Sequence, residues 1–275
     1  LERIIASATG PGVVCVATIR EAERLRASLS ARFGGEEAIA LYHGKLGAVE
    51  RTRTQERFMA GALRAMVATN AFGLGVDKPD VRFVAHYHFP GSLESYYQEA
   101  GRAGRDGAPA LCALLYRVED KRIQSYFLGG RYPEVEEAAR AALALERHPV
   151  RSPVALDDLA DQSGVPRRKA RIVLLLLKRH GLVREHRGGR WERLAGNLTS
   201  VDLRADLTDY EERRARDQAR LRAMVGYCQT TRCRTRTILE HFGEPVVADW
   251  RCDNCDACEA QAAREGRQAV TTAAA

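Results

Sequence analysis

Short apolar runs alternate with amphipathic stretches over the first half of the chain. The run VVCVAT at residues 13–18 is apolar throughout, which is typical of a strand buried on both faces of a parallel sheet. The next stretch, residues 19–33, carries charge on one face and Ala22, Leu25 and Leu29 on another, which predicts a helix. Further strands are expected at residues 38–42, 65–69, 82–87 and 109–116, and a second helix at residues 46–59.

This alternation predicts an α/β domain with a parallel sheet and helices on both faces. Sheets of this kind bind ligands at the carboxyl ends of their strands. We therefore expect functional residues in the loops that follow Thr18, Tyr42, Thr69 and His88.

The pattern changes after a helical linker at residues 119–147. A short helix at residues 156–162 is followed by a tight turn and by a second helix that starts beside Pro166, where a proline is well tolerated. Two short strands then flank Gly188-Gly189 as a hairpin. Helix, turn, helix and hairpin, in this order, predict a winged-helix domain.

The last part of the chain predicts a long charged helix at residues 206–229 and a partner helix at residues 230–242, followed by clustered cysteines. The Ala-, Gln- and Arg-rich tail is expected to be disordered. The predicted division is residues 1–130 for the parallel-sheet domain, 131–200 for linker and winged helix, 201–258 for a helical cysteine-rich domain, and 259–275 for the tail.

Composition narrows the class of protein. The net charge of +7 favours a polyanionic partner such as DNA, although basic surfaces also serve solubility. No apolar run is long enough to span a membrane, and no secretion signal is present, so we expect no membrane partner. Five of the seven cysteines lie between Cys228 and Cys258, which indicates a metal site and a reducing, cytoplasmic location.

The winged-helix segment is the most basic part of the chain, with twelve Arg and Lys against five Asp and Glu over residues 147–193. Trp191 is able to stack on an exposed base, but a tryptophan in this position also commonly packs the hairpin onto the helices. Winged helices serve as protein–protein modules too. The candidates for DNA contact are Arg167, Arg168, Lys169, Arg187, Arg190 and Trp191.

Three cysteines with two-residue gaps, Cys252, Cys255 and Cys258, suit a tetrahedral metal. A fourth ligand is needed, and Cys233 and Cys228 are the two candidates. Either thiol is equally consistent with a small buried hydrophobic residue. Four thiolates would leave no open coordination position, so the zinc is expected to be structural.

Two arginines three residues apart, Arg102 and Arg105, lie in the Gly-rich stretch QEAGRAGRDG that begins at Gln98. Glycines let a backbone approach closely, and the planar guanidinium group binds phosphate through two parallel hydrogen bonds. The alternative is a solvated pair of surface arginines beside a helix end.

This stretch and the one before it, VATNAFGLGVDKPDVRFV from Val67, resemble motifs V and VI of the RecQ family of superfamily 2 DNA helicases. Val14-Cys15 and Tyr42-His43-Gly44 resemble earlier motifs of the same domain. The resemblance covers about residues 10–130 and resumes at residues 206–258.

The resemblance implies a second RecA-like domain, whose first RecA-like partner domain carries the phosphate-binding loop, ATP and Mg²⁺. It implies that Arg105 is the arginine finger with Arg102 beside it, and that Asp77 and Gln98 couple nucleotide to DNA. It also implies that three residues, His43, Thr69 and Asn70, lie near the DNA backbone.

The chain has no G-x-x-x-x-G-K-[ST] sequence, so we expect it to hydrolyse no ATP alone. The resemblance also implies Cys233 as the fourth zinc ligand, because Cys233 precedes basic residues and a Phe242-Gly243-Glu244 stretch that matches the family. The order of domains departs from the family, in which the winged helix generally follows the zinc domain. Here the winged-helix pattern comes first.

The leading hypothesis is the C-terminal part of an ATP-dependent 3′-to-5′ DNA helicase that acts on single-stranded or forked DNA in repair or recombination. A non-enzymatic DNA-binding regulator with a winged helix and a zinc module is the alternative. A protein-interaction scaffold is a third. Residues 67–107 favour the helicase, because a regulator has no use for a pair of arginines that act across a domain interface.

Overall fold

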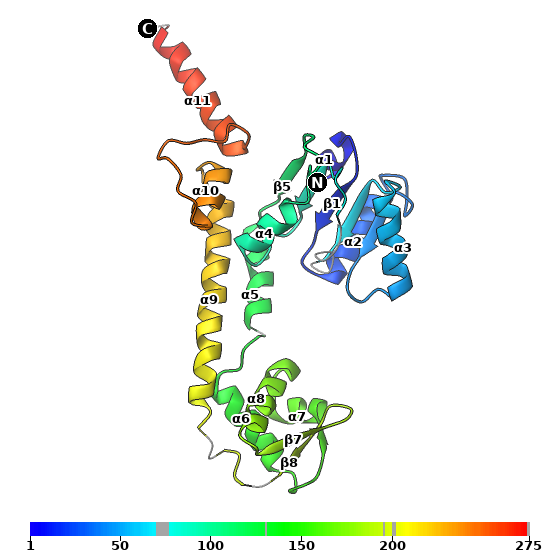
Figure 1. Cartoon of the computed structure of the whole chain (residues 1–275), viewed down its shortest axis with the longest axis vertical. Coiled ribbons are helices and arrows are strands. Elements are labelled where there is room, and N and C mark those ends of the chain that lie inside the picture. The colour runs from blue at the N-terminus through cyan, green and yellow to red at the C-terminus, as the bar shows by residue number, and fades with distance from the viewer. Residues whose placement is uncertain (70–76, 130, 195, 200–201, 274–275) are drawn as a thin grey trace. The chain divides into compact units, whose positions relative to one another are not determined.

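The computed structural model describes residues 1–69, 77–129, 131–194, 196–199 and 202–273. They form two compact units (Figure 1). We call residues 1–121 together with 220–275 the sheet unit, and residues 122–219 the winged unit. The boundaries differ from the predicted division, because the C-terminal cysteine-rich segment is grouped with the sheet and the linker helix is grouped with the winged helix.

The sheet unit contains five parallel strands in the order β2-β3-β1-β4-β5. The apolar run at residues 13–18 contributes the central strand, and Val14 lies beside Val67 of one neighbour and Ala85 of the other. The parallel sheet predicted from the sequence is therefore confirmed. Its strands are β1 (Gly12–Cys15), β2 (Ile39–Tyr42), β3 (Ala65–Ala68), β4 (Phe83–His86) and β5 (Leu111–Leu114).

Helices cover both faces of this sheet, as predicted. Leu29 packs with Val14 and Val67 in the core on one face, whereas Phe58 packs with Met66 in the core on the other. Thr18 caps the first of the covering helices by accepting a hydrogen bond from the Glu21 amide. The helices before β5 are α1 (Glu2–Ser7), α2 (Ile19–Ser30), α3 (Ala48–Met59) and α4 (Leu93–Ala100).

The winged unit has the predicted order of helix, helix and hairpin. Its three-stranded antiparallel sheet has the order β6-β8-β7, in which β6 is a two-residue strand that the sequence pattern does not predict. The apolar face of α8 forms the core with Leu145 and Trp191. Its elements are α6 (Val135–Glu146), β6 (Val154–Ala155), α7 (Leu156–Ser163), α8 (Arg167–Arg179), β7 (Val183–His186) and β8 (Arg190–Arg193).

The remaining elements show two differences from the sequence analysis. The helical linker consists of two helices with a break between them, and the tail expected to be disordered lies in a helix. Ala, Gln, Arg and Glu dominate the tail and all have high helix propensity, and acidic residues in its first turn favour the helix dipole. These elements are a short turn (Val118–Asp120), α5 (Lys121–Gly129), α9 (Arg204–Gln229), α10 (Arg234–His241) and α11 (Asp256–Ala273).

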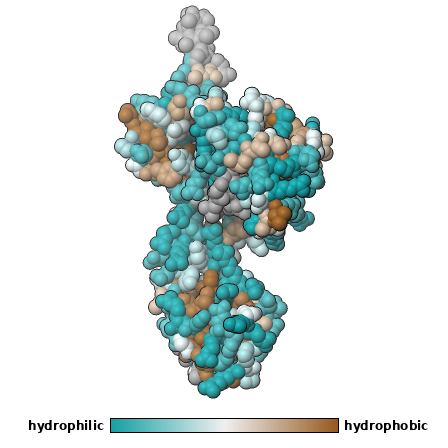
Figure 2. Space-filling view, turned by 45° about the vertical axis from the view of Figure 1, so that its right-hand side comes forward, coloured by the Kyte–Doolittle hydropathy of each residue, from teal (hydrophilic) through white to brown (hydrophobic). Residues whose placement is uncertain are grey.

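The surface is mostly hydrophilic on the face shown in Figure 2. Among the described residues, no helix combines the length and the apolar character that crossing a membrane requires.

Gly12 is a sensitive position in the central strand. It pairs with Phe83 of β4, and a Cβ atom at Gly12 would overlap the buried Phe83 ring. Gly12→Ala is therefore expected to lower the free energy of unfolding by about 1–3 kcal/mol, measured by urea denaturation. Gly226→Ala, in the exposed interior of α9 with open space around it, should instead raise stability by up to about 1 kcal/mol. Equal effects of the two substitutions would contradict this assignment.

Candidate functional site

The loop that carries the arginine pair, residues 101–107, begins where α4 ends, and we call it the arginine loop. Ser92 caps α4 through a 3.2 Å hydrogen bond from the Ser95 amide, and the helix ends before Gly101. Gly104 has a φ of +63°, and a Cβ there would lie 2.8 Å from the Ala108 carbonyl oxygen. Its amide donates to the Val81 carbonyl oxygen at 2.9 Å. The loop is thus folded closely against the start of β4, in a form that requires glycine.

Arg105 is held at the surface of this loop. Its Nη1 lies 2.5 Å from Oδ1 of Asp77, and its Nε donates to the Gly101 carbonyl oxygen at 3.2 Å. The Arg105 side chain is 42% exposed and Asp77 is 84% exposed, so a competing anion has access to both. Arg102 is half-buried three residues earlier, and Gln98 is exposed on α4. The sequence analysis gave Asp77 and Arg105 separate roles, and the structure brings them together.

Two further contacts fix the loop, and the sequence offered no indication of either. Arg82, at the start of β4, forms an ion pair with Asp106. His86, fully buried at the end of β4, has its Nε2 2.7 Å from Oε2 of Glu99 on α4. The partners are 24 and 13 residues apart in the chain, so no local pattern reveals them.

The carboxyl ends of the parallel strands gather several of the predicted residues. His43 follows β2, Thr69 follows β3, and the Thr69 amide donates to the Tyr42 carbonyl oxygen at 3.1 Å. His43 is 5% exposed, and its Nδ1 accepts a 3.2 Å hydrogen bond from the Lys45 amide. His88 follows β4, where burial lowers the pKa of its imidazole. Asn70 lies outside the described residues.

A second candidate site lies in the C-terminal part of the sheet unit. The Sγ atoms of the four cysteines gather within 4.8 Å of one another, and Cys252 and Cys258 are 4.0 Å apart. A tetrahedral zinc with Zn–S bonds of about 2.3 Å places its sulfur atoms about 3.8 Å apart, so the geometry fits zinc. The residues that would hold it are Cys233, Cys252, Cys255 and Cys258.

The surroundings of these thiols also suit a metal site. The Arg234 amide donates to Sγ of Cys255 at 3.3 Å, as expected for a thiolate ligand. Asp253 has a φ of 51°, a left-handed conformation that turns the chain between the first two thiols of the run. Burial opposes ionisation of Cys252, but hydrogen bonds from Thr235 and from the Asn254 amide outweigh it and lower the pKa of Cys252 to about 7.

Cys228, the rival ligand, does not belong to this cluster. Burial raises the pKa of the Cys228 thiol. Its place outside the four-thiol cluster suits a small core residue rather than a metal ligand.

Two family models match this chain. The helicase conserved C-terminal domain matches residues 1–107, and the RecQ zinc-binding domain matches residues 195–259. The two matches coincide with the parts that carry the arginine loop and the four thiols.

Known proteins give the same family. The ATP-dependent DNA helicase RecQ of Bacillus subtilis (strain 168) is 31% identical over 89% of this chain and 28% of its own length. RecQ of Synechocystis sp. is 34% identical over 89% of this chain and 48% of its own length. The chain belongs to the RecQ family. It corresponds to the C-terminal part of a RecQ-family helicase and spans less than half the length of these two relatives.

Among solved structures, the C-terminal domain of the DEAD-box protein Dbp5 is 28% identical, with 46% of this chain and 75% of that chain covered. Its TM-score is 0.37. The RecQ zinc-binding model and the four-thiol cluster together support a structural zinc.

The structure corrects two of the expected DNA contacts of this RecQ chain. Trp191 is fully buried in the winged unit, where β8 pairs with β6 and β7, so it cannot stack on a base. Its alternative role, packing the hairpin onto the helices, is the one observed. Lys169 is 7% exposed, with its Nζ 2.8 Å from both carboxylate oxygens of Glu137 on α6. It joins two helices and is not available to DNA.

The other four basic candidates lie at the surface of the winged unit. Arg167 forms an ion pair with Asp157, and Arg190 donates to the Pro153 carbonyl oxygen at 2.8 Å. Arg168, at the start of α8, and Arg187, in the turn of the hairpin, are exposed. The basic surface is thus smaller than the residue count suggests, because carboxylates and carbonyl groups already engage part of it.

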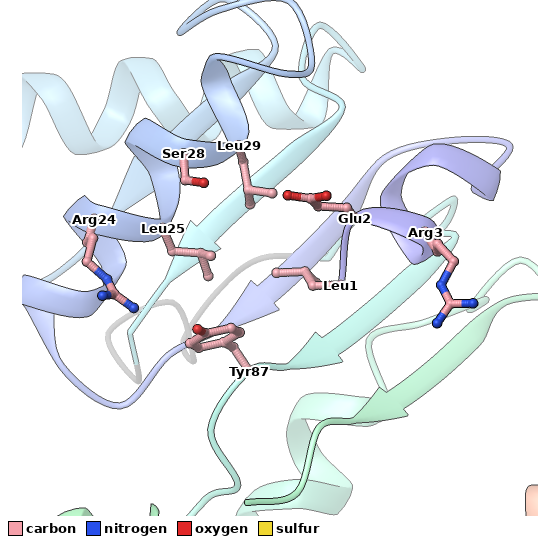
Figure 3. Close-up of a pocket in the computed structure, with 8 residues that line it drawn as sticks. All are labelled: Leu1, Glu2, Arg3, Arg24, Leu25, Ser28, Leu29 and Tyr87. Atoms are coloured by element: carbon pink, nitrogen blue, oxygen red, sulfur yellow. The ribbon is translucent and has the colours of Figure 1, made fainter.

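A surface pocket of about 590 Å³ lies apart from these residues (Figure 3). Leu25 and Leu29 of α2, Leu1 and the Tyr87 ring provide its apolar lining. Glu2 at its edge pairs with Arg32 at 2.7 Å. None of the predicted site residues lines the pocket.

The zinc ligands give a direct test. Cys252→Ser is expected to lower the zinc content of the purified chain well below that of the wild type, because three thiols leave the tetrahedral site incomplete. Structural zinc of this kind contributes on the order of 10 kcal/mol to local folding, so the helical signal of the C-terminal segment should fall as well. Metal content is measured by mass spectrometry. Cys228→Ser is the matched control and should keep its zinc; a loss in this control would move the ligand assignment to Cys228.

Proposed function

We propose that this chain is the second RecA-like half of an ATP-dependent 3′-to-5′ DNA helicase that unwinds DNA in repair or recombination. The observation that carries the proposal is the exposed Arg105–Asp77 pair on a loop fixed by Gly104 and by the Arg82–Asp106 pair. The family relationship supports it, because the relatives are named ATP-dependent DNA helicases.

In the absence of nucleotide, an arginine finger needs another anion to hold its guanidinium group, and Asp77 provides a carboxylate for Arg105. A guanidinium group binds a carboxylate and a phosphate with the same planar geometry. Asp77 therefore holds Arg105 at the exposed surface of the loop, where a phosphate carried by the first RecA-like domain would be able to replace it. Arg102 is the second cation, and Gln98, exposed on α4, would couple the nucleotide to DNA.

ATP and Mg²⁺ belong to the complete enzyme. Bound ATP with Mg²⁺ supplies the phosphoryl group that is transferred to water. Within this chain the residues would bind, orient and neutralise charge: Arg105 and Arg102 would supply positive charge to the γ-phosphate, and Asp77 would give up its contact with Arg105 when a phosphate replaces it. This half lacks a phosphate-binding loop of its own, so it is inactive without the first domain, its partner in the same protein.

The test adds the first RecA-like domain, as a separate protein or in the full-length enzyme. Arg105→Ala should lower the kcat of DNA-stimulated ATP hydrolysis by about 10³-fold or more, because the charge of the transition state loses its arginine. The matched control is Arg53→Ala, an exposed arginine of α3, which should leave kcat unchanged. An unchanged kcat in Arg105→Ala, or steady ATP turnover by this chain alone, would overturn the proposal.

We also propose that DNA contacts two surfaces. Thr69 and Asn70 would lie near the backbone of one strand, with the buried His43 following the neighbouring strand β2, and Arg168 and Arg187 of the winged unit would bind phosphates. The partner is single-stranded or forked DNA, and the location is cytoplasmic, in keeping with thiols that are placed to hold zinc rather than paired in disulfides. We also propose that the functional domains follow the predicted division rather than the two compact units: a parallel-sheet domain to residue 130, the linker and winged helix to residue 200, and the helical cysteine-rich domain to residue 258.

The role of the winged unit is testable on this chain. Arg168→Ala and Arg187→Ala should each weaken binding to a 3′-tailed DNA and reduce the slope of log affinity against log salt by about one, since each removes one phosphate contact. Arg140→Ala, an exposed arginine on α6, is the control. If neither variant changes the slope, the winged unit is a protein-interaction module and DNA binding belongs to the sheet unit.

The alternative is a non-enzymatic DNA-binding protein with a winged helix and a zinc module. One observation favours this alternative: the exposed basic residues of the winged unit are able to bind DNA without any contribution from a first RecA-like domain. The Arg105→Ala experiment distinguishes the two functions. A regulator would bind DNA but would show no ATP hydrolysis that depends on Arg105, whichever domain is added.

A further inference from the structure

Helix α4, which leads into the arginine loop, is contacted along its outer side by the helices of the cysteine-rich segment. Nε2 of His241, the last residue of α10, lies 3.1 Å from Oε1 of Glu94 in the first turn of α4. The Tyr97 and Phe242 rings are 5.1 Å apart. One turn of α4 therefore carries a hydrogen bond and an aromatic contact to the end of α10.

A third contact joins α4 to the long helix α9. The rings of Tyr96 and Tyr227 are 5.1 Å apart, and both residues are buried, at 6% and 5% exposure. Burial raises the pKa of both phenol groups, so the hydroxyls stay protonated and able to hydrogen-bond each other. Glu94, Tyr96 and Tyr97 lie within four consecutive residues, so a single turn of α4 carries all three contacts.

The same helices are fixed by the zinc cluster through Arg234. This residue follows Cys233, and its amide donates to Sγ of Cys255 at 3.3 Å. Its guanidinium group bonds both carboxylate oxygens of Asp256, at 2.9 and 3.0 Å, and the Tyr227 carbonyl oxygen at 2.7 Å. Arg234 thus joins the end of α9, the start of α10 and the cysteine run.

On its inner side α4 is joined to the sheet. The Tyr96 ring lies 4.9 Å from the His86 ring, and His86 Nε2 binds Glu99 at 2.7 Å. Glu99 accepts the Arg102 amide through its carbonyl oxygen at 3.3 Å, at the first residue of the arginine pair. A continuous series of contacts therefore runs from the Cys255 thiol to Arg102, all within the sheet unit.

We propose that Tyr227, His241 and Phe242 are positioning residues for the arginine loop, and that zinc binding is coupled through them to the conformation of α4. The proposal rests on the proposed function for the meaning of the loop, but the coupling itself is a property of this chain. Zinc folds the cysteine run, the run fixes α9 and α10, and these helices hold α4 at the angle from which Arg102 and Arg105 project.

Thermodynamic linkage between zinc binding and the docking of α4 gives a test that does not require helicase or ATPase activity. If zinc stabilises the docked α4, then disrupting the docking must weaken zinc binding by the same factor. Glu94→Gln combined with Tyr97→Ala should therefore lower zinc affinity about two- to tenfold, measured by competition with a chromophoric chelator. The control is Glu50→Gln, which removes a glutamate from the first turn of α3 and should leave the affinity unchanged. Both substituted side chains of α4 are partly exposed, so the fold should survive.

Hydrogen exchange of the whole chain provides the second measurement. Removing zinc with a chelator should increase amide exchange in α4 and in residues 101–107, and should leave α2 and α3 unchanged. Unchanged exchange in α4, while α10 loses protection, would overturn the proposal; so would wild-type zinc affinity in the double variant. The proposed helicase function is tested by a different measurement, the kcat of Arg105→Ala. The coupling and the helicase function can therefore be refuted independently.

Discussion

A partly buried hydrogen bond between His86 and Glu99 joins the sheet to the helix that precedes the arginine pair. His86 is fully buried at the end of β4, and Glu99 is the residue before the last of α4. A buried carboxylate or imidazole without a partner costs several kcal/mol, so each group strongly favours the packing that brings in the other. The contact therefore fixes α4 over β4 and, with it, the direction in which the loop of Arg102 and Arg105 leaves the helix.

The parallel sheet around this contact was predictable from the chain because each strand is a short apolar run between polar loops. Val13 and Val14 face opposite sides, and only a strand covered by helices on both sides is apolar at consecutive positions. The cysteines were equally informative, since two-residue gaps are a local property of the sequence. The fourth thiol, Cys233, lies far from the others in the chain and was identified through the family resemblance.

The winged unit shows where local pattern is insufficient. Trp191 was assigned to a DNA-facing wing or to packing, and the second role is the one observed: its side chain is buried in the core with residues of α8, and Val154 and Ala155 add a third strand that pairs with its own. A two-residue strand has no measurable periodicity. Lys169 looked like a recognition-helix cation, but its partner Glu137 is 32 residues away. Only the packing of α6 against α8 brings the two charges together, so a count of basic residues overstated the surface available to phosphate.

Magnitudes limit how strongly the zinc cluster is able to act on the arginine loop. Zinc binding in such sites is worth about 10–16 kcal/mol, but a ligand shifts an equilibrium only by its differential affinity for the two states. The shared part is set by the contacts between α10, α9 and α4. An aromatic pair contributes about 0.5–1.5 kcal/mol, and a partly exposed ion pair such as Glu94–His241 contributes about 0–1 kcal/mol. Two aromatic pairs and this polar contact sum to about 1–4 kcal/mol, which changes the population of a correctly placed Arg105 by about fivefold or more and is still far too small for the loop to decide whether the zinc module folds.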